Sequence, residues 1–211
     1  MARNDPIYKL VYFDLRGLGE TARQIFAYAA VEYEDHRIKR EDWPYQKDAT
    51  PFRTLPYLEV DGEVIGQSNA ICRFLARRFN LAGRDDLEQA RVDALVDYVN
   101  DVRNGGLIGW FREEDKEKKE KLKAEYFNKT VHGYLETFEK HLKANTDSNA
   151  EYFVGSGPTW ADIHIAILMG MLQDVEPTVL AKYPLLKAHK ARVENLKGIK
   201  EWIQKRPKTA M

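Results

Sequence analysis

The sequence lacks the features that point to metal, nucleic-acid or membrane chemistry. Its 211 residues include one cysteine, Cys72, so no internal disulfide and no cysteine–histidine zinc cluster is expected. Lysine plus arginine number 33, and so do aspartate plus glutamate, whereas nucleic-acid binders usually carry a basic excess. The longest apolar stretch, residues 163–172, is far shorter than the ~20 residues that span a bilayer. We therefore expect no metal, no nucleic acid and no membrane partner.

The cellular compartment is also indicated by what is missing. The opening residues, MARNDPIYKL, contain no apolar segment of the kind that a secretory signal needs. A single cysteine fits a reducing compartment, so we expect a cytoplasmic protein. Cys72 has no Cys-x-x-Cys partner, and we interpret it as a small buried apolar residue.

The first 80 residues alternate between strand and helix signals. Residues 8–13 are aromatic and aliphatic, which is typical of a strand. A helix is expected from about Glu20, and residues 33–38 predict a second strand. The helix is predicted because Ala22, Ile25, Phe26 and Ala29 share one face.

The rest of this part reads as a hairpin and a second helix. Residues 57–60 and 63–65 predict strands joined by Asp61-Gly62, the strongest short-range signal for a type I′ turn. Ser68 is expected to be the N-cap of a helix that ends near Phe79. The order β-α-β, a long loop, then β-β-α is that of a thioredoxin-like domain.

Beyond Gly83 only helices are predicted, over about 86–110, 116–143, 160–174 and 184–195. Thr159-x-x-Asp162 fits a capping box with aspartate at N3, and the apolar helix that follows should be buried on all sides. We therefore predict a thioredoxin-like domain, residues 1–81, a linker over 82–84, and an all-α domain, residues 85–211.

Short motifs along the chain carry a family resemblance. They are Tyr8-Lys9-Leu10-Val11-Tyr12-Phe13, Arg16-Gly17 with Glu20, Asp42-Trp43-Pro44, Leu55-Pro56, Gln67-Ser68-Asn69-Ala70-Ile71 and Thr159-Trp160-Ala161-Asp162. Over nearly the whole chain the sequence resembles the cytosolic glutathione S-transferases. Within that family it is similar to the sigma class, or to the sigma-like invertebrate class, which is related to the haematopoietic prostaglandin D synthases.

The resemblance implies that the Tyr12 hydroxyl donates a hydrogen bond to the sulfur of glutathione, the co-substrate. A free thiol titrates near ~8.5, and only the thiolate is a strong nucleophile. A hydrogen bond to a charged acceptor contributes ~1.5–3 kcal/mol, which at ~1.36 kcal/mol per pKa unit lowers the thiol pKa by about one to two units. From the residues alone, Tyr12 is interpreted as a core tyrosine on a buried strand. Tyr8, four residues earlier, is the other candidate for the catalytic tyrosine, and the alignment with the family motif favours Tyr12.

The same resemblance implies further glutathione contacts, each with a plainer structural alternative. Leu55-Pro56 would be a cis peptide whose backbone pairs with the cysteinyl residue, where an ordinary trans proline would start an edge strand. Gln67-Ser68 would hold the γ-glutamyl carboxylate at a helix N-terminus, where Ser68 could also be a cap alone. Trp43 and Lys47 would reach the glycyl end, or belong to an ordinary surface loop.

A homodimer follows from the resemblance as well. Asp101 of one subunit would reach the γ-glutamyl amine in the partner subunit's site; on its own it reads as a solvated helix carboxylate. Phe52, apolar and on a loop, is the candidate anchor into the partner.

The second substrate is expected in a pocket lined by Phe13, Leu18, Gly106 and Trp110. Leu18 stands where many sigma-class members carry an arginine, and Thr54 replaces a lysine or glutamine. Asn100 replaces a carboxylate of a cation-binding cluster, so no metal is predicted. Residues 103–111 also depart from the prostaglandin synthases.

Four functions remain open. The first is glutathione transferase activity (EC 2.5.1.18) on small hydrophobic electrophiles, a detoxification reaction. The second is a glutathione-dependent prostaglandin D synthase. The third is a non-catalytic carrier of hydrophobic ligands such as haem. The fourth is a structural or interaction module built on the same fold. Tyr12 together with the predicted glutathione contacts favours the first.

Overall fold

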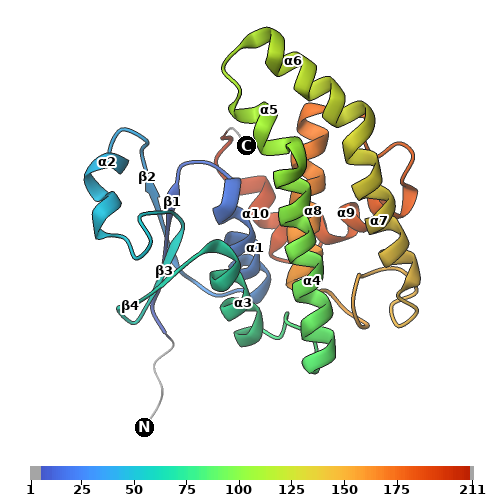
Figure 1. Ribbon diagram of the computed structural model, residues 1–211. Helices are drawn as coiled ribbons and strands as arrows, with labels where there is room; N and C mark the ends of the chain where they lie inside the picture. Colours follow the sequence, from blue (N-terminus) through green and yellow to red (C-terminus); the bar gives the residue numbers. More distant parts are fainter. Residues whose placement is uncertain (1–5, 210–211) are drawn as a thin grey trace. The chain divides into compact units, whose positions relative to one another are not determined.

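The computed structural model of the chain, which describes residues 6–209, contains a four-stranded sheet (Figure 1). The strand order is β2-β1-β3-β4; β1 is parallel to β2 and antiparallel to β3. Asp61 and Gly62 have φ angles of 52° and 90°, as a type I′ turn requires, so the predicted hairpin is confirmed. The strands are β1 (Tyr8–Phe13), β2 (Glu34–Ile38), β3 (Tyr57–Val60) and β4 (Glu63–Gly66).

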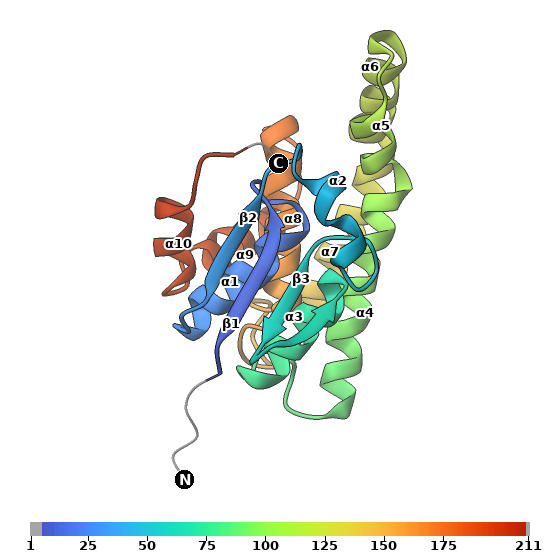
Figure 2. The same cartoon turned by 90° about the vertical axis from the view of Figure 1, so that its left-hand side faces the viewer.

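Two helices, α1 (Glu20–Ala29) and α3 (Ser68–Arg78), pack together on one face of this sheet (Figure 2). On α1, Ile25 and Phe26 are fully buried, as its predicted apolar face requires. The expected thioredoxin-like arrangement is therefore present. The predicted loop before β3 holds two short helical pieces that the sequence did not reveal, α2 (Trp43–Gln46) and η2 (Lys47–Ala49).

The predicted N-cap of α3 is wrong by one residue. Ser68 is the first residue of the helix, and Gln67 occupies the N-cap position with φ 69° and ψ 117° and no capping side chain. The helix starts early because β4 runs directly into it, so the turn is confined to Gln67.

The chain from Ala82 to Glu194 is helical. Helix α8 lies in its core: ten of its residues, among them Trp160, are buried. The capping box of Thr159 and Asp162 is present, so this prediction is confirmed. None of the helices within residues 6–209 has both the length and the apolar character needed to cross a membrane. The helices are α4 (Asp86–Val102), α5 (Ile108–Arg112), α6 (Lys116–Glu125), α7 (Val131–Ala144), α8 (Trp160–Val175) and α9 (Pro184–Glu194).

Two of the predicted long helices are interrupted by π-helical turns, η3 (Arg103–Leu107) and η4 (Tyr126–Thr130), which pack against each other. At η3 the backbone kinks, because Gly106 has φ 138°, a value that L side chains rarely adopt. A Cβ on Gly106 would lie 2.7 Å from Cδ2 of Tyr126. The aromatic ring of η4 therefore fills the space that a side chain would take.

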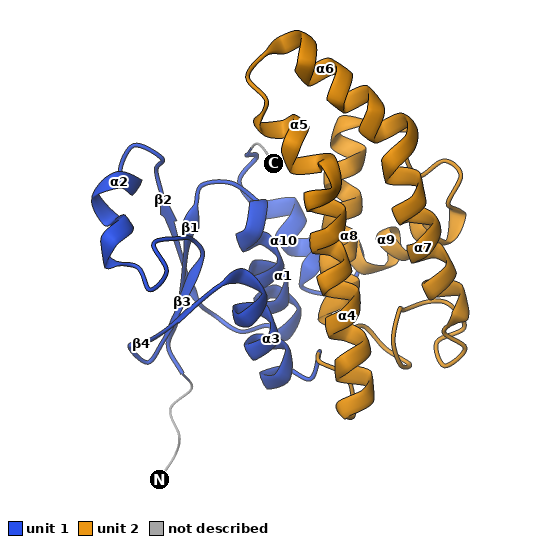
Figure 3. Ribbon diagram, in the orientation of Figure 1, with its two compact units in different colours: residues 1–81, 195–211 blue, residues 82–194 orange. Residues whose placement is uncertain are grey.

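The contacts divide the chain into two compact units (Figure 3). The first ends at Leu81 but also includes the described residues from Asn195 onward. These residues carry α10 (Ile199–Lys205), a helix that was not predicted and that packs against α1. The C-terminal segment thus groups with the thioredoxin-like unit, not with the helical domain of 85–211 to which it was assigned.

Candidate active site

The strand register brings the predicted residues of the first unit to one edge of the sheet. Tyr57, the first residue of β3, is opposite Val11 of β1 and opposite Gly66, the last residue of β4. Tyr12, Leu55-Pro56 and Gln67-Ser68 each lie within two residues of these positions in the chain. The end of β1, the approach to β3 and the start of α3 therefore meet.

An apolar cluster surrounds Tyr12 at this edge. Its buried members include Tyr12 and Leu55, and Phe13, Leu18 and Trp43 pack against them half-buried. The Phe13 and Trp43 rings meet edge to face with centroids 5.7 Å apart, a favourable arrangement for aromatic pairs. Five of the residues predicted for glutathione or its partner substrate are thus in one cluster.

Tyr12 is the tyrosine of β1 that reaches this edge. It is 6% exposed, and its hydroxyl accepts a hydrogen bond from the Leu18 backbone N–H at 3.0 Å. Tyr8, four residues earlier, packs instead on Phe26 and Phe79 with ring centroids 5.2 and 6.2 Å away. The geometry therefore favours Tyr12 over Tyr8.

Two backbone features lie at the same edge of the sheet as Tyr12, just before β3 and just after β4. The Leu55-Pro56 peptide is cis, as the resemblance implied. Gln67 adopts a positive φ with an extended ψ, a strained conformation for a residue with a side chain. Such strain is concentrated at ligand sites, and the N–H groups of the first turn of α3 have no intrahelical partner.

The 43–49 segment contributes residues of different character. Trp43 is half-buried in the Tyr12 cluster, whereas the Lys47 side chain is exposed. The Lys47 backbone carbonyl accepts a hydrogen bond from the Thr50 hydroxyl at 2.8 Å, which stabilises this turn.

The remaining predicted residues belong to the second unit. Asp101 is exposed on α4, Gly106 lies in the kink at η3, and Trp110 is buried on α5. The Trp110 ring packs against Phe127, with centroids 6.1 Å apart. How these residues approach Tyr12 stays a prediction.

The sequence did not single out a pair of charges beneath the site. Glu20 and Arg23, one helical turn apart on α1, are 1% and 0% exposed. The available signal was their position: both fall among the apolar residues of a helix with a buried face, where an ion is costly unless it is paired.

Among the described residues, no cysteine supplies a nucleophile in addition to the thiol of glutathione. Cys72 is buried, and that burial raises the pKa of its thiol to about 12, so it stays protonated. Within residues 6–209, no group of three or more His, Cys, Asp or Glu side chains is placed to hold a metal ion.

A thioredoxin-like unit followed by a helical unit is the architecture of the glutathione transferases. The model of the glutathione S-transferase N-terminal domain matches residues 8–77, and that of the C-terminal domain matches residues 100–206. The chain belongs to the glutathione S-transferase family.

Curated and solved relatives cover the chain almost completely. Glutathione S-transferase 1 of Ascaris suum is 44% identical, covering 97% of this chain and 98% of its own length. Hematopoietic prostaglandin D synthase of Gallus gallus is 43% identical, covering 98% and 100%. The structure of prostaglandin synthase D of Nilaparvata lugens superimposes with a TM-score of 0.88 at 38% identity, covering 96% and 100%.

Proposed function

We propose that this chain conjugates glutathione to small hydrophobic electrophiles, with Tyr12 stabilising the reacting thiolate. The observation that carries this is the Tyr12 hydroxyl beside the Leu18 N–H, at the sheet edge where Leu55 and the start of α3 also lie. The glutathione thiol loses its proton to solvent, the thiolate attacks an electrophilic carbon, the leaving group departs, and a thioether forms. The tyrosine lowers the free energy of the thiolate without being consumed.

The other residues hold the tripeptide. The Leu55 backbone pairs with the cysteinyl residue, and the N–H groups at Ser68 receive the γ-glutamyl carboxylate, which the helix dipole favours. Trp43 and Lys47 contact the glycyl end, where the exposed ammonium group faces a carboxylate. Phe13, Leu18, Gly106 and Trp110 line the pocket for the electrophile.

Two assays test this function together. Retention on glutathione–agarose reports binding, and turnover of chlorodinitrobenzene with glutathione reports catalysis. Retention with turnover supports the proposal. Retention without turnover favours the alternative of a carrier for hydrophobic ligands such as haem, and the loss of both contradicts the proposal.

The biological setting is proposed from the same features. We place the reaction in the cytoplasm, since the free thiol of Cys72 suits a reducing compartment. The curated relatives include nematode transferases and vertebrate prostaglandin synthases, which supports a sigma-like enzyme of detoxification.

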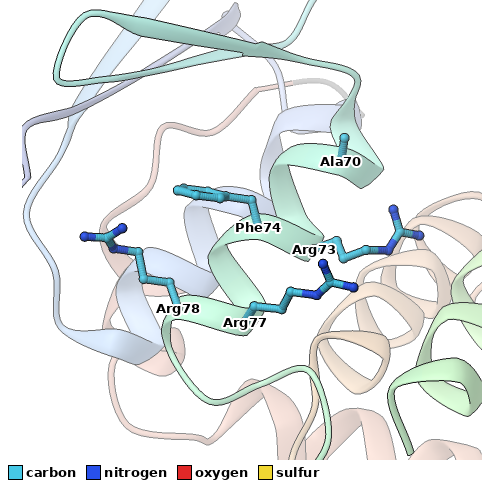
Figure 4. A pocket seen from close by; sticks show the side chains of 5 residues that line it. All are labelled: Ala70, Arg73, Phe74, Arg77 and Arg78. Atoms are coloured by element: carbon cyan, nitrogen blue, oxygen red, sulfur yellow. The ribbon is translucent and has the colours of Figure 1, made fainter. Parts of the chain in front are cut away.

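We further propose a homodimer that joins α3 of one subunit to α4 of its partner. One side of α3 carries a groove of about 440 Å³ lined by three arginines and an aromatic ring (Figure 4). On α4, Asp93, Asp97 and Asp101 recur every four residues, so they share a helix face. The opposite charges of the two faces are complementary, and Asp101 would then reach the partner's glutathione. The groove residues are Ala70, Arg73, Phe74, Arg77 and Arg78.

Arg77→Glu is expected to raise the dimer dissociation constant by at least about ten-fold, because like charges at an interface cost several kcal/mol. Arg77 is exposed on α3, so the change leaves the fold of the unit intact. Analytical ultracentrifugation over a concentration series measures the effect, and Lys121→Glu, the same kind of charge reversal on exposed α6, is the control.

The dimer has to be measured because Na-GST-3 of Necator americanus, 37% identical to this chain with a TM-score of 0.85, is described as monomeric. A wild-type protein that sediments as an active monomer at micromolar concentration contradicts the dimer. If Asp101→Ala leaves the KM for glutathione unchanged, the proposed contact of Asp101 with the partner's glutathione is wrong, but the dimer itself is not contradicted.

Prostaglandin D synthesis is a second candidate, favoured by relatives of that name. In this reaction the thiolate attacks one peroxide oxygen of prostaglandin H2, so an S–O bond forms, the O–O bond breaks and the other oxygen takes up a proton. A base then removes the proton from the carbon that bears the sulfur-bound oxygen, a C=O bond forms there, and the S–O bond breaks to release the glutathione thiolate. The first step needs only the Tyr12-activated sulfur. The outcome also needs a lipid held in one pose, since misplacement by about 1 Å costs ~100-fold.

We expect isomerase activity to be detectable but secondary. The pocket segment 103–111 departs from the specialised synthases and contains the kink at Gly106. The measurement is kcat/KM for prostaglandin D2 formation beside kcat/KM for chlorodinitrobenzene conjugation. Selective D2 formation at the higher constant would make the synthase the main function.

A further inference from the structure

The Tyr12 hydroxyl has a second partner in addition to the sulfur it is proposed to hold. The Leu18 backbone N–H donates to its oxygen at 3.0 Å. A hydrogen bond accepted by a hydroxyl oxygen polarises the O–H group and strengthens it as a donor. At the position where Leu18 stands in place of an arginine side chain, a backbone group thus acts on the tyrosine directly.

The turn that carries this N–H is packed against the tyrosine ring. It contains η1 (Gly17–Gly19), and a Cβ on Gly17 would lie 2.6 Å from the Tyr12 hydroxyl oxygen. A Cβ on Gly19 would lie 2.7 Å from Cδ1 of the same ring. The Tyr12 ring therefore packs directly against the backbone of Gly17 and Gly19. A shift of this turn would move the Leu18 N–H relative to the Tyr12 hydroxyl.

Arg23 of α1 holds this turn through hydrogen bonds to its backbone. Its Nη1 donates to the Leu15 carbonyl at 2.7 Å and its Nη2 to the Phe13 carbonyl at 3.4 Å. The guanidinium carbon also lies 5.8 Å from the centroid of the Tyr12 ring, within the range of a cation–π contact. One fully buried side chain thus holds both the strand end and the start of the turn.

Carboxylates on two elements hold Arg23 in turn. Its Nε donates to Asp35 of β2 at 3.0 Å, and Glu20 lies 3.8 Å from its Nη1. Glu20 also accepts the indole N–H of Trp202 at 2.9 Å and a bond from Arg206. Trp202 of α10 and Arg206, the residue after this helix, therefore provide the remaining partners of the buried Glu20 carboxylate.

We propose that Arg23 is a positioning residue for Tyr12: by fixing the Phe13 and Leu15 carbonyls, it keeps the Leu18 N–H on the tyrosine hydroxyl. The proposal rests on the proposed role of Tyr12. A lysine cannot replace the arginine, because its single ammonium group lacks the planar fork of donors that reaches two carbonyls and a carboxylate at once.

The test uses Arg23→Lys, which keeps the buried charge. The thiolate fraction of bound glutathione is followed by its ultraviolet absorbance as a function of pH, beside kcat and KM. We expect the thiolate fraction at about pH 6.5, below the ~8.5 of a free thiol, to fall about three- to ten-fold, with kcat falling in parallel and KM for glutathione changing less than about two-fold.

A double-mutant cycle separates positioning from a general structural role. In a Tyr12→Phe background, Arg23→Lys should leave the thiolate fraction unchanged, because the group through which it acts is gone. An equal loss in both backgrounds overturns the proposal. If Tyr12→Phe alone leaves the thiolate fraction unchanged, the role of Tyr12 fails and the positioning role falls with it. An effect of Tyr12→Phe without an effect of Arg23→Lys overturns positioning only.

A milder pair of variants covers the case in which Arg23→Lys does not fold. Asp35 and Asp14 both pair with Arg37, but only Asp35 contacts Arg23. Asp35→Asn should lower the thiolate fraction in the same direction, whereas Asp14→Asn should not. Equal behaviour of the two variants contradicts the proposal.

Discussion

Tyr12→Phe is expected to lower kcat by at least about ten-fold, with a small change in the affinity for glutathione. The hydroxyl is proposed to hold the thiolate, and a hydrogen bond to a charged acceptor contributes ~1.5–3 kcal/mol. At ~1.36 kcal/mol for each factor of ten, this corresponds to about one to two decades. Affinity should change little because most contacts with the tripeptide are proposed to lie at other residues, such as Leu55, Ser68 and Trp43.

The pH dependence makes this result specific. Without the hydroxyl, the pKa of the bound thiol rises towards the ~8.5 of a free thiol. The thiolate is the deprotonated form, so the deficit of the variant is largest at low pH and narrows as the pH passes the raised pKa. Rates from about pH 6 to pH 9 measure this narrowing.

Tyr8→Phe is the matched control, since it removes the same hydroxyl from the same strand. Tyr8 packs among Phe26 and Phe79, away from the ligand edge, so its variant should keep wild-type turnover. A Tyr12→Phe enzyme with wild-type turnover at about pH 6.5, well below the free thiol pKa, would refute the assignment.

The sequence was most informative where local chemistry decides local structure. The Asp61-Gly62 turn, the face of α1 with Ile25 and Phe26, and the capping box before α8 each depend on residues a few positions apart. These signals are enough to define the order of a thioredoxin-like unit and a buried helix. They do not depend on which distant segment packs on them.

The errors have a different origin. The helical pattern continues through η3 and η4, but the packing of Tyr126 against Gly106 breaks it, and that contact is not local. Helix α10 has seven residues, too few for a clear periodicity, and it joins the first unit through contacts with α1. Gln67 takes the N-cap position because β4 leads straight into α3.

The candidate site was predictable to a similar degree. The resemblance supplied Tyr12 and its neighbours, and the sheet register explains why they meet. The buried charges Glu20 and Arg23 were not predicted. Their position among the apolar residues of α1 indicates burial, but the sequence does not show which distant groups pair with them. Those partners are on β2 and α10, and the second of these elements was itself missed.

Asp162→Ala is expected to reduce the free energy of unfolding by about 3–5 kcal/mol, because it removes the acceptor of several buried hydrogen bonds. Asp162 and His189 are both fully buried, and one Asp162 oxygen accepts His189 Nε2 and the Phe153 N–H, each at 2.9 Å. The other oxygen accepts the N–H and the hydroxyl of Thr159 at 2.8 and 2.7 Å. Alanine leaves four donors in the core without an acceptor, and each carries a desolvation cost of about 1–3 kcal/mol.

Asp162→Asn separates the two parts of this effect, because its amide oxygen still accepts while its charge is gone, so it should lose less than alanine does. Glu120→Gln, at an exposed position of helix α6, is the control and should change stability by less than about 0.5 kcal/mol. Urea unfolding followed by circular dichroism gives the values, at one fixed protein concentration because association contributes to apparent stability. The motif is assigned to folding, so the folded fraction of each variant should keep its kcat. A loss below about 1 kcal/mol for Asp162→Ala would show that the four bonds are replaced by water, and that the start of α8 is less tightly held than its geometry indicates.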